Sequence, residues 1–278
     1  MIEAPEALFL SEQLRGLLRG REITDLIPSH DPHKFTFYCG NPDTYIDLLT
    51  GKTITDVYAR GGLIIISLSA GVYLAFTDGI NLRYLEPGDK LPKKFQFLMG
   101  FKDQSCLIAS TRMYGGILAF TDEGSDLPIY QYYLAAHDKP QVMSDAFSEK
   151  YFLELIDAES HQKKSAKAFL ATDQTIPGLG NGVLQDILFN ACIHPKTKIG
   201  ELSRKQKTAL FGSIKETLHR MYELKGRNTE TDLFGTPGKY IPVLSSKTAG
   251  KPCPVCGETI RKEAYLGGSI YYCPHCQK

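Results

Sequence analysis

Four cysteines near the C-terminus have the spacing of a metal site. Cys253 and Cys256 form one close pair, and Cys273 and Cys276 form a second pair after a gap of sixteen residues. Two such pairs supply the four thiolates that a tetrahedral structural zinc requires, and the glycines and β-branched residues between them are typical of a hairpin. A hairpin of this size cannot bury its own core, so metal binding must supply folding energy. We therefore predict one structural zinc ion in a ribbon, in preference to two disulfides.

A glycine-rich turn is the second feature that could form a binding site. Gly178, Gly180 and Gly182 surround Asn181, directly before an apolar stretch with helical spacing. Glycines allow another backbone to approach closely, and amide groups at the start of a helix attract anions such as phosphate. The turn is a candidate phosphate site, although the same glycines could serve only to separate two helices.

The composition limits the class of protein. Of the 278 residues, 42% are hydrophobic and 23% are charged, which is ordinary for soluble globular proteins and enough for two domains. We expect no membrane span and no secretion signal, because no apolar run approaches about eighteen residues and the first residues are acidic. The other cysteines, Cys39, Cys106 and Cys192, are scattered, which fits a reducing cytoplasm.

The charge is divided unevenly along the chain. Residues 1–150 have a net charge of −5 and residues 151–278 one of +6. A basic half that also contains the expected zinc ribbon favours a polyanionic partner such as nucleic acid. A chance surplus of solvated lysines would give the same numbers.

The periodicity predicts an α+β fold. Residues 5–18 have the spacing of an amphipathic helix, and from 22 to about 120 short β-branched or aromatic runs alternate with turn residues. Repeated short strands of this kind predict an antiparallel β-sandwich or barrel. The expected strands cover residues 35–39, 63–69, 72–77, 95–99 and 106–109. Helical spacing follows, and the expected helices cover residues 147–157, 160–171, 182–192 and 202–225.

These patterns divide the chain into four parts. The N-terminal helix and β-sandwich domain is expected over residues 1–125, and the helical domain over 145–225. Residues 226–250 are rich in glycine, proline and small polar residues, which predicts a mobile loop. The zinc ribbon occupies residues 251–278.

The order of these features resembles that of the formamidopyrimidine-DNA glycosylase and endonuclease VIII family. That family has a Gly-Leu-Gly-Asn turn in a helix–two-turn–helix domain and ends in a four-cysteine zinc finger. The matching residues here are Gly178 to Asn181 and the ribbon from Cys253 to Gln277, and Glu3-Ala-Pro5-Glu6 opens the chain as in the family. The resemblance covers the whole chain. It implies an N-terminal antiparallel β-sandwich with a leading helix, a helix–two-turn–helix domain and a four-cysteine zinc ribbon.

The resemblance also implies double-stranded DNA, damaged or abasic, as the partner. Asn181 matches the family's Asn that binds phosphates beside the lesion, together with the backbone amides of the turn, including Gly178 and Gly180. Lys167 matches a phosphate-binding Lys. From the residues alone, Lys167 could equally lie on a solvated helix face beside other lysines.

Two further side chains match those that contact a distorted duplex. Arg112 and Tyr114 lie in a segment that resembles the one whose Arg and aromatic side chains fill the gap left by a flipped nucleotide. That role is physically sensible because an extruded base leaves an unpaired partner and a broken stack. An ordinary aromatic hairpin is the alternative.

The N-terminus departs from the family pattern. There, an exposed Pro amine attacks C1′ of the damaged nucleotide after Met removal, and an adjacent Glu acts on the sugar. Here Ile2 has the place of that Pro, and we expect Met1 to be retained because Ile2 is bulky. The Met1 amine would then lie up to about 3.8 Å further out, and a misplacement of about 1 Å can cost about a hundredfold in rate. Glu3 matches the family's Glu, although it could simply be an acid near a helix start.

Three other family residues are replaced by glycine. Gly62 has the place of a catalytic Lys, Gly268 that of an Arg aimed at the phosphate beside the lesion, and Gly79 that of a wedge Met. The residues that the resemblance implies for DNA binding are therefore present, whereas those that it implies for catalysis are largely replaced.

Two functions fit this pattern. We favour a cytoplasmic DNA glycosylase that hydrolyses the N-glycosidic bond of a flipped base, with the AP-lyase step weak or lost. Glu3 would activate a water, or the Met1 amine would act after a backbone shift. The alternative is a non-catalytic protein that binds lesions or distorted DNA. A ribbon protein that binds RNA or protein fits less well, because it leaves Asn181 and Lys167 without a purpose. The sequence predicts no oligomeric state.

Overall fold

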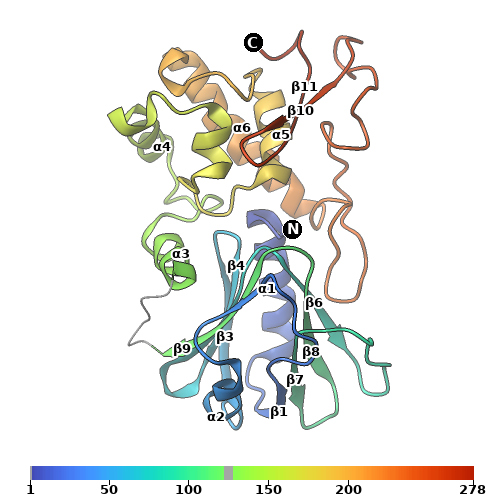
Figure 1. The fold of residues 1–278 in the computed structure, drawn as a ribbon. Coiled ribbons are helices and arrows are strands. Elements are labelled where there is room, and N and C mark those ends of the chain that lie inside the picture. The colour runs from blue at the N-terminus through green and yellow to red at the C-terminus, as the bar shows by residue number, and fades with distance from the viewer. Residues whose placement is uncertain (1, 122–127) are drawn as a thin grey trace.

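The computed structural model describes residues 2–121 and 128–278, and it has two halves (Figure 1). The half drawn below contains the β-sheets and helix α1 (Ala4–Leu18), and the half drawn above contains the later helices and the C-terminal hairpin. The N-terminus lies between the halves, where residues from both can meet.

Two sheets pack against each other in the β-rich half. One has the strand order β1-β7-β8-β6 and is antiparallel, and the other has the order β2-β9-β5-β4-β3. The β2–β9 pair is parallel, which is the one departure from an antiparallel sandwich within the described strands. The rings of Phe76 and Phe97, one from each sheet, lie 5.8 Å apart between centroids. The strands are β1 (Ile23–Ile27), β2 (Thr36–Tyr38), β3 (Ile54–Arg60), β4 (Leu63–Leu68), β5 (Val72–Phe76), β6 (Ile80–Leu85), β7 (Phe97–Phe101), β8 (Cys106–Thr111) and β9 (Gly115–Thr121).

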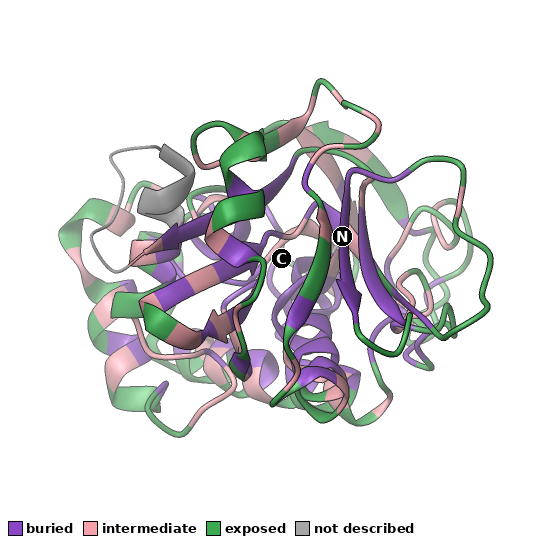
Figure 2. Cartoon of the chain, turned by 90° about the horizontal axis from the view of Figure 1, so that it is seen from below, coloured by how far each residue is buried: buried purple, intermediate pink, exposed green. Residues whose placement is uncertain are grey.

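Helix α1 belongs to the core of the sandwich. Leu10, Leu14 and Leu18 recur at the spacing of one helical turn, are at most 3% exposed, and share an apolar cluster with residues of both sheets. A short helix, α2 (Tyr45–Leu49), packs near β1 and β9. Figure 2 shows that the buried residues lie mainly along the strands and on the inner faces of helices. The packing of α1 fixes the residues that precede it, including Glu3, between the two halves.

The helical half confirms most of the expected helices. Helices α4 (Glu149–Asp157), α5 (Asn181–Asn190) and α6 (Arg204–Glu223) correspond to three of them, and their apolar faces share a second core cluster. The fourth expected helix, 160–171, is instead a 3₁₀ turn over Glu159–His161 and a π-helical turn over Ala168–Thr172. Helix α3 (Pro128–Asp138), which follows the β-rich half, was not predicted.

Residues 226–250, all of which the structure describes, form no regular helix or strand. They nevertheless contain buried anchors. The carboxylate of Asp186 on α5 accepts hydrogen bonds from the Tyr240 hydroxyl (2.8 Å) and from the amides of Val243 (2.9 Å) and Leu244 (2.8 Å). Leu233 is fully buried in the core of the β-rich half. These contacts therefore hold the segment to α5 and to the core of the β-rich half.

The chain ends in a two-stranded antiparallel hairpin, β10 (Arg261–Tyr265) and β11 (Gly268–Tyr272), as the ribbon pattern predicts. The hairpin lies against α5, since Gln185 accepts a hydrogen bond from the Tyr271 amide (2.9 Å) and donates to the Ser269 carbonyl (3.2 Å). Among the described residues, no helix is both long and apolar enough to cross a membrane.

Candidate functional site

Glu3 connects the N-terminal segment to the glycine turn. Its side chain is buried, and its Oε1 and Oε2 atoms accept hydrogen bonds from the amides of Gly182 (2.8 Å) and Val183 (2.7 Å). A carboxylate is stabilised there by the positive end of α5. The amides of Gly182 and Val183 at the start of α5 are thus occupied by the protein's own anion and are not open to phosphate. The phosphate contacts expected from Gly178, Gly180 and Asn181 remain predictions.

A buried arginine from the 226–250 segment completes this contact. The Nε and Nη2 atoms of Arg227 donate to the two oxygens of Glu6 (2.8 and 3.0 Å), and its Nη1 atom lies 3.4 Å from Oε1 of Glu3. All three side chains are nearly inaccessible to solvent. Burial would lower the pKa of Arg227, but the two carboxylates outweigh that effect and raise it. Burial would likewise raise the pKa of Glu6, but the charge and hydrogen bonds of Arg227 lower it. Arg227 and Glu6 are therefore held as ions.

The glycines of the turn are required by close contacts. A Cβ on Gly180 would lie 2.7 Å from the carboxyl carbon of Glu3, and one on Gly182 would lie 1.4 Å from Nη1 of Arg227. Gly178 has a φ of +87°, and a Cβ there would lie 2.5 Å from the carbonyl carbon of Gly61. Gly178 and Gly180 therefore join the turn to the β-rich half, in addition to the DNA contact that the resemblance implies for them.

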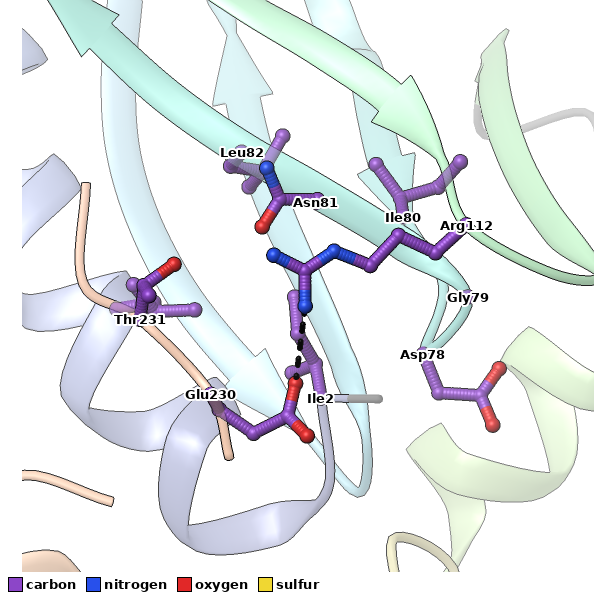
Figure 3. A pocket seen from close by; sticks show the side chains of 10 residues that line it. Ile2, Asp78, Gly79, Ile80, Asn81, Leu82, Arg112, Glu230 and Thr231 are labelled. Atoms are coloured by element: carbon purple, nitrogen blue, oxygen red, sulfur yellow. Dashed lines mark ion pairs between the residues drawn. The ribbon is translucent and has the colours of Figure 1, made fainter. Parts of the chain in front are cut away.

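The β5–β6 turn forms the other wall of the site. Its Asp78 carbonyl accepts a hydrogen bond from the amide of Ile2 (2.9 Å), and the Ile2 side chain is buried. A small pocket lined by Ile2, Asp78, Arg112 and Glu230 lies beside this contact (Figure 3). In Figure 3 the Arg112 guanidinium points toward Glu230, with 3.8 Å between the paired atoms, while the Asp78 carboxyl group lies at the opposite side. We call the region formed by Ile2–Glu3, Gly61–Gly62, Asp78–Gly79 and Gly178–Gly182 the junction.

Asp78 has an unusual environment for a carboxyl group. Burial, together with the nearby charge of Glu3, raises the pKa of Asp78 to about 6. The turn that carries it is fixed, because the Thr77 side chain accepts a hydrogen bond from the Gly116 amide (2.7 Å) and the Gly79 carbonyl accepts one from the Arg112 amide (3.1 Å). A carboxyl group with a pKa near the working pH can exchange protons during a reaction.

Gly62 faces this carboxyl group. A Cβ at Gly62 would lie 3.8 Å from the Cβ of Asp78 and 3.5 Å from the Ile2 carbonyl, which are ordinary van der Waals distances. The backbone of Gly62 does not have a positive φ. The junction could therefore accommodate a side chain at this position without strain, although the protein has none.

Arg112 and Tyr114 lie together at the tip between β8 and β9. About half of each side chain is exposed, and the Tyr114 ring lies 4.4 Å from that of Phe35 and 6.3 Å from that of Phe37, with which it is nearly parallel. The Tyr114 backbone occupies the space beside Gly79, because a Cβ there would lie 1.8 Å from the Tyr114 carbonyl oxygen. No side chain fits at Gly79 with the β8–β9 tip in this position.

An open cavity of about 270 Å³ lies between this tip and the junction. Its lining combines the aromatic rings of Phe37 and Tyr114 with the polar groups of Asp78 and Gln174. A mixture of flat apolar walls and a few polar groups is typical of sites for planar ligands.

Lys167 and Asn181 meet the hairpin on the opposite side of the glycine turn. Lys167 is 2% exposed and its Nζ atom donates to the Tyr265 carbonyl, which rules out a solvated helix face. Asn181 donates to the Ser269 carbonyl (3.2 Å), and its Oδ1 atom is buried without a hydrogen-bond partner in the described structure. A Cβ on Gly268 would lie 2.6 Å from the Asn181 side-chain nitrogen. The structure thus places the two predicted phosphate-binding side chains next to each other.

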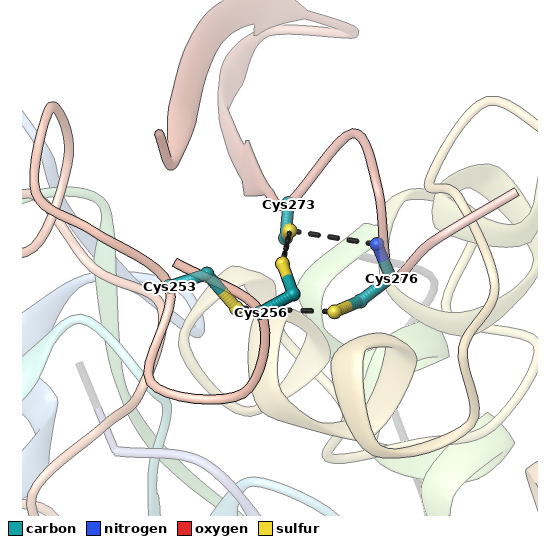
Figure 4. Close-up of side chains that lie close together, drawn as sticks. All are labelled: Cys253, Cys256, Cys273 and Cys276. Carbon is teal, nitrogen blue, oxygen red and sulfur yellow. Dashed lines mark hydrogen bonds between the residues drawn. The ribbon is translucent and has the colours of Figure 1, made fainter. Parts of the chain in front are cut away.

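The four cysteines of the ribbon converge (Figure 4). Their sulfur atoms all lie within 4.8 Å of one another, with 3.9 Å between Cys253 and Cys276 and 3.4 Å between Cys256 and Cys273. A tetrahedral zinc with Zn–S bonds of about 2.3 Å requires sulfurs about 3.8 Å apart, whereas a disulfide requires about 2.05 Å. The spacing fits a zinc ion held by the four thiolates and excludes disulfides.

Outside the zinc centre, the predicted site residues that the structure describes therefore fall into three groups. Glu3, Gly178 and Gly180 lie at the junction, and Lys167 and Asn181 lie beside the zinc hairpin, with Arg112 and Tyr114 at the tip across the cavity. Met1 lies outside the described residues. Asp78 and Arg227 were not predicted as site residues. The only available signals were an ordinary Asp-Gly turn and a single arginine in a segment expected to be mobile.

Comparisons with known proteins agree with this arrangement. The family model described as the formamidopyrimidine-DNA glycosylase H2TH domain matches residues 139–232, and the zinc finger found in FPG and IleRS matches residues 250–278. A formamidopyrimidine-DNA glycosylase of Methylococcus capsulatus is 30% identical over 84% of each chain. One of Legionella pneumophila is 28% identical over 100% of this chain and 98% of its own.

Solved structures share the fold. A complex of Lactococcus lactis Fpg with DNA containing an abasic site superposes with a TM-score of 0.82 at 24% identity, covering 99% of both chains. The MutM (Fpg) protein of Thermus thermophilus gives a TM-score of 0.82 at 22% identity, covering 99% of this chain and 98% of its own. Together with the sequence relatives, the fold and the zinc centre define the class: this chain belongs to the formamidopyrimidine-DNA glycosylase family.

Proposed function

We propose that this protein acts in base-excision repair, binding duplex DNA at damaged or abasic sites and hydrolysing the N-glycosidic bond of a flipped base. The observation that carries the proposal is the pair of hydrogen bonds that the carboxylate of Glu3 accepts from the amides of Gly182 and Val183. It places an N-terminal carboxylate against the turn that, through Asn181, would hold the DNA backbone. Names of the relatives support the same activity, since those compared are called formamidopyrimidine-DNA glycosylases.

The DNA contacts follow from the side chains beside the hairpin. Lys167 and Asn181 would bind phosphates, and Arg112 and Tyr114 would enter the duplex where the nucleotide leaves. In the structure, Lys167 and Asn181 donate to the carbonyls of Tyr265 and Ser269. Phosphate oxygens would have to replace these carbonyls, so the hairpin would shift slightly when DNA binds. The zinc ion holds the hairpin together during that shift.

The reaction would proceed without a covalent amine intermediate. The nitrogen of Ile2 is a peptide amide bonded to the Asp78 carbonyl, so it cannot act as a nucleophile. We take water as the nucleophile in place of an amine, and the carboxylate of Glu3 would stabilise positive charge that develops on the sugar as the base leaves. Cleavage of the DNA strand, which depends on an amine adduct in the family pattern, would be weak or lost.

Borohydride trapping tests the proposal. The zinc-loaded full chain is incubated with duplexes carrying an abasic site, an oxidised purine or an oxidised pyrimidine, with and without sodium borohydride. We expect free base from at least one damaged duplex and no covalent adduct. A trapped adduct would show that an amine acts after all. Binding to damaged duplexes without release of base would instead support the alternative function, a non-catalytic lesion-binding protein.

A further inference from the structure

Two carboxyl groups lie at the junction, and their surroundings differ. Glu3 accepts two backbone hydrogen bonds and lies beside Arg227, so its oxygens are committed to fixed donors. Asp78 is carried by a turn that also lines the open cavity of about 270 Å³, where water and a nucleotide could reach it. Pairs of carboxyl groups in contrasting environments commonly divide the work of an active site between a charged stabiliser and a group that exchanges protons.

Building on the hydrolytic function proposed above, we propose that Asp78 is the general base that activates water for base release in this protein. Its carboxylate takes one proton from a water molecule in the cavity, and the water oxygen forms a bond to C1′. The N-glycosidic bond breaks, and its electron pair leaves with the base, which takes up a proton from solvent. Asp78 then returns its own proton to solvent, so the sum is hydrolysis of the glycosidic bond.

Three observations place Asp78 in this role. Its carbonyl holds the Ile2 amide at 2.9 Å, so it is adjacent to the segment that carries Glu3. Asp78 lines both the small pocket at Ile2 and the larger cavity bounded by Tyr114. Gly62 leaves the space facing it without a side chain, so no lysine at this position neutralises the carboxylate.

The charged groups around Asp78 set the pH at which it works. Glu3 from the start of α1 raises the pKa of Asp78, in addition to the larger effect of burial, and the terminal ammonium acts in the opposite direction. Arg112 and Glu230 share the small pocket with Asp78, but they pair with each other. Tyr114 is the titratable group across the cavity. With a pKa of about 6, Asp78 is mostly ionised at neutral pH and can accept a proton.

The test measures single-turnover base release against pH, using the damaged duplex that gives the fastest release from the wild-type protein. For the wild type we expect the rate to rise with pH through a group of pKa about 6 and then level off. Asp78→Asn should lower the rate at pH 7 by about 100-fold or more and remove this rise. Its affinity for a duplex with a tetrahydrofuran abasic analogue should stay within about threefold, which separates catalysis from binding.

A second variant tests the same group without removing it. Gly62→Lys places an ammonium opposite Asp78, which should lower the pKa of the carboxyl group and move the rise in rate to lower pH. Gly62→Ala, which adds only the Cβ, should leave the position of the rise unchanged.

Different results would overturn the role of Asp78 and the hydrolytic function on which it rests. If the wild type releases base and Asp78→Asn keeps both its rate and its pH profile, Asp78 is not the base, while the glycosylase function stands. A pH profile that moves equally in Gly62→Lys and Gly62→Ala would also overturn the role of Asp78. If the wild type binds the tetrahydrofuran duplex but releases no base from any substrate, both the role of Asp78 and the hydrolytic function fail.

Discussion

Several ionisable side chains lie at or beside the junction, where base release is proposed to occur. Glu3 is stabilised by the start of a helix, and Arg227 and Glu6 by each other, whereas Asp78 retains a raised pKa in a partly buried turn. A carboxyl group of that kind costs stability when it ionises, because burial disfavours its charged form. Groups that are costly to the fold in this way tend to occur at functional sites.

The raised pKa of Asp78 predicts a pH-dependent stability difference. Asp78 binds its proton more tightly in the folded protein than in the unfolded chain, where the usual value is 3.8, so its contribution to stability falls as pH rises from about 4 to 6. Asp78→Asn should therefore raise the free energy of unfolding by about 1–3 kcal/mol at pH 7 and by little below pH 4. Urea unfolding at several pH values measures this. Asp47→Asn, at an exposed position in α2, is the control. A pH-independent gain in Asp78→Asn would show that the pKa of Asp78 is not raised by the fold.

Gly182 supports a second prediction at this scale. A Cβ there would collide with Arg227 and lie 2.8 Å from Oε1 of Glu3, so Gly182→Ala should lower the free energy of unfolding by about 1–3 kcal/mol and displace Glu3. Gly212→Ala is a matched control, because Gly212 lies in α6 with nothing within 4 Å of its Cβ position. That control should gain up to about 1 kcal/mol from helix propensity. Equal effects of the two substitutions on thermal unfolding would show that the Gly182 contact is not tight.

Several elements were predictable from the sequence because their signals are local. Helix α1 and strands β4 and β5 follow clear apolar patterns, and the spacing of the cysteines defines the zinc centre. Strands β1, β3, β6 and β9 were not predicted. In β3 and β6, charged residues such as Asp56 and Arg83 interrupt the apolar pattern. The path of residues 226–250 depends on Asp186 and on the Glu3–Glu6 pair, which are distant in sequence, so the composition of the segment could not reveal it.

The anchoring of that segment can be measured through Arg227. Its removal leaves Glu6 buried without its ionic partner, and losing one member of a buried pair costs about 3–5 kcal/mol. Arg227→Met should lower the free energy of unfolding by that amount. The control is Arg204→Met, which breaks an exposed ion pair with Asp157 at 3.1 Å and should cost less than about 1 kcal/mol. Similar losses for both variants in urea unfolding would mean that Arg227 is not an anchor.

At the scale of the whole molecule, two halves with separate cores meet at the glycine turns. The β-rich half contributes Asp78, Arg112 and Tyr114, and the helical half contributes Lys167 and Asn181, so neither half contains the candidate site alone. Under the proposed function, the helical side would hold phosphates and the junction would receive the flipped nucleotide. The resemblance gave the order of the parts, whereas the contact between Glu3 and the turn required the three-dimensional structure.

Salt dependence tests the phosphate contacts. Each phosphate contact made by a lysine releases about 0.9 counterions, so Lys167→Met should reduce the slope of log affinity against log salt by about 0.9. The measurement uses a tetrahydrofuran duplex over a series of salt concentrations. Lys150→Met on α4, an exposed position remote from the hairpin, should leave the slope unchanged. An unchanged slope in Lys167→Met would remove Lys167 from the DNA interface.

The most direct test of the central claim is the amount of free base released per protein molecule in a single turnover, measured by mass spectrometry. The zinc-loaded wild type and Glu3→Gln are compared on damaged duplexes under conditions in which both are fully bound. We expect about one free base per wild-type molecule, and a loss of about 100-fold or more in rate for Glu3→Gln. Equal release by the two proteins would contradict the claim that the carboxylate against the glycine turn belongs to the active site.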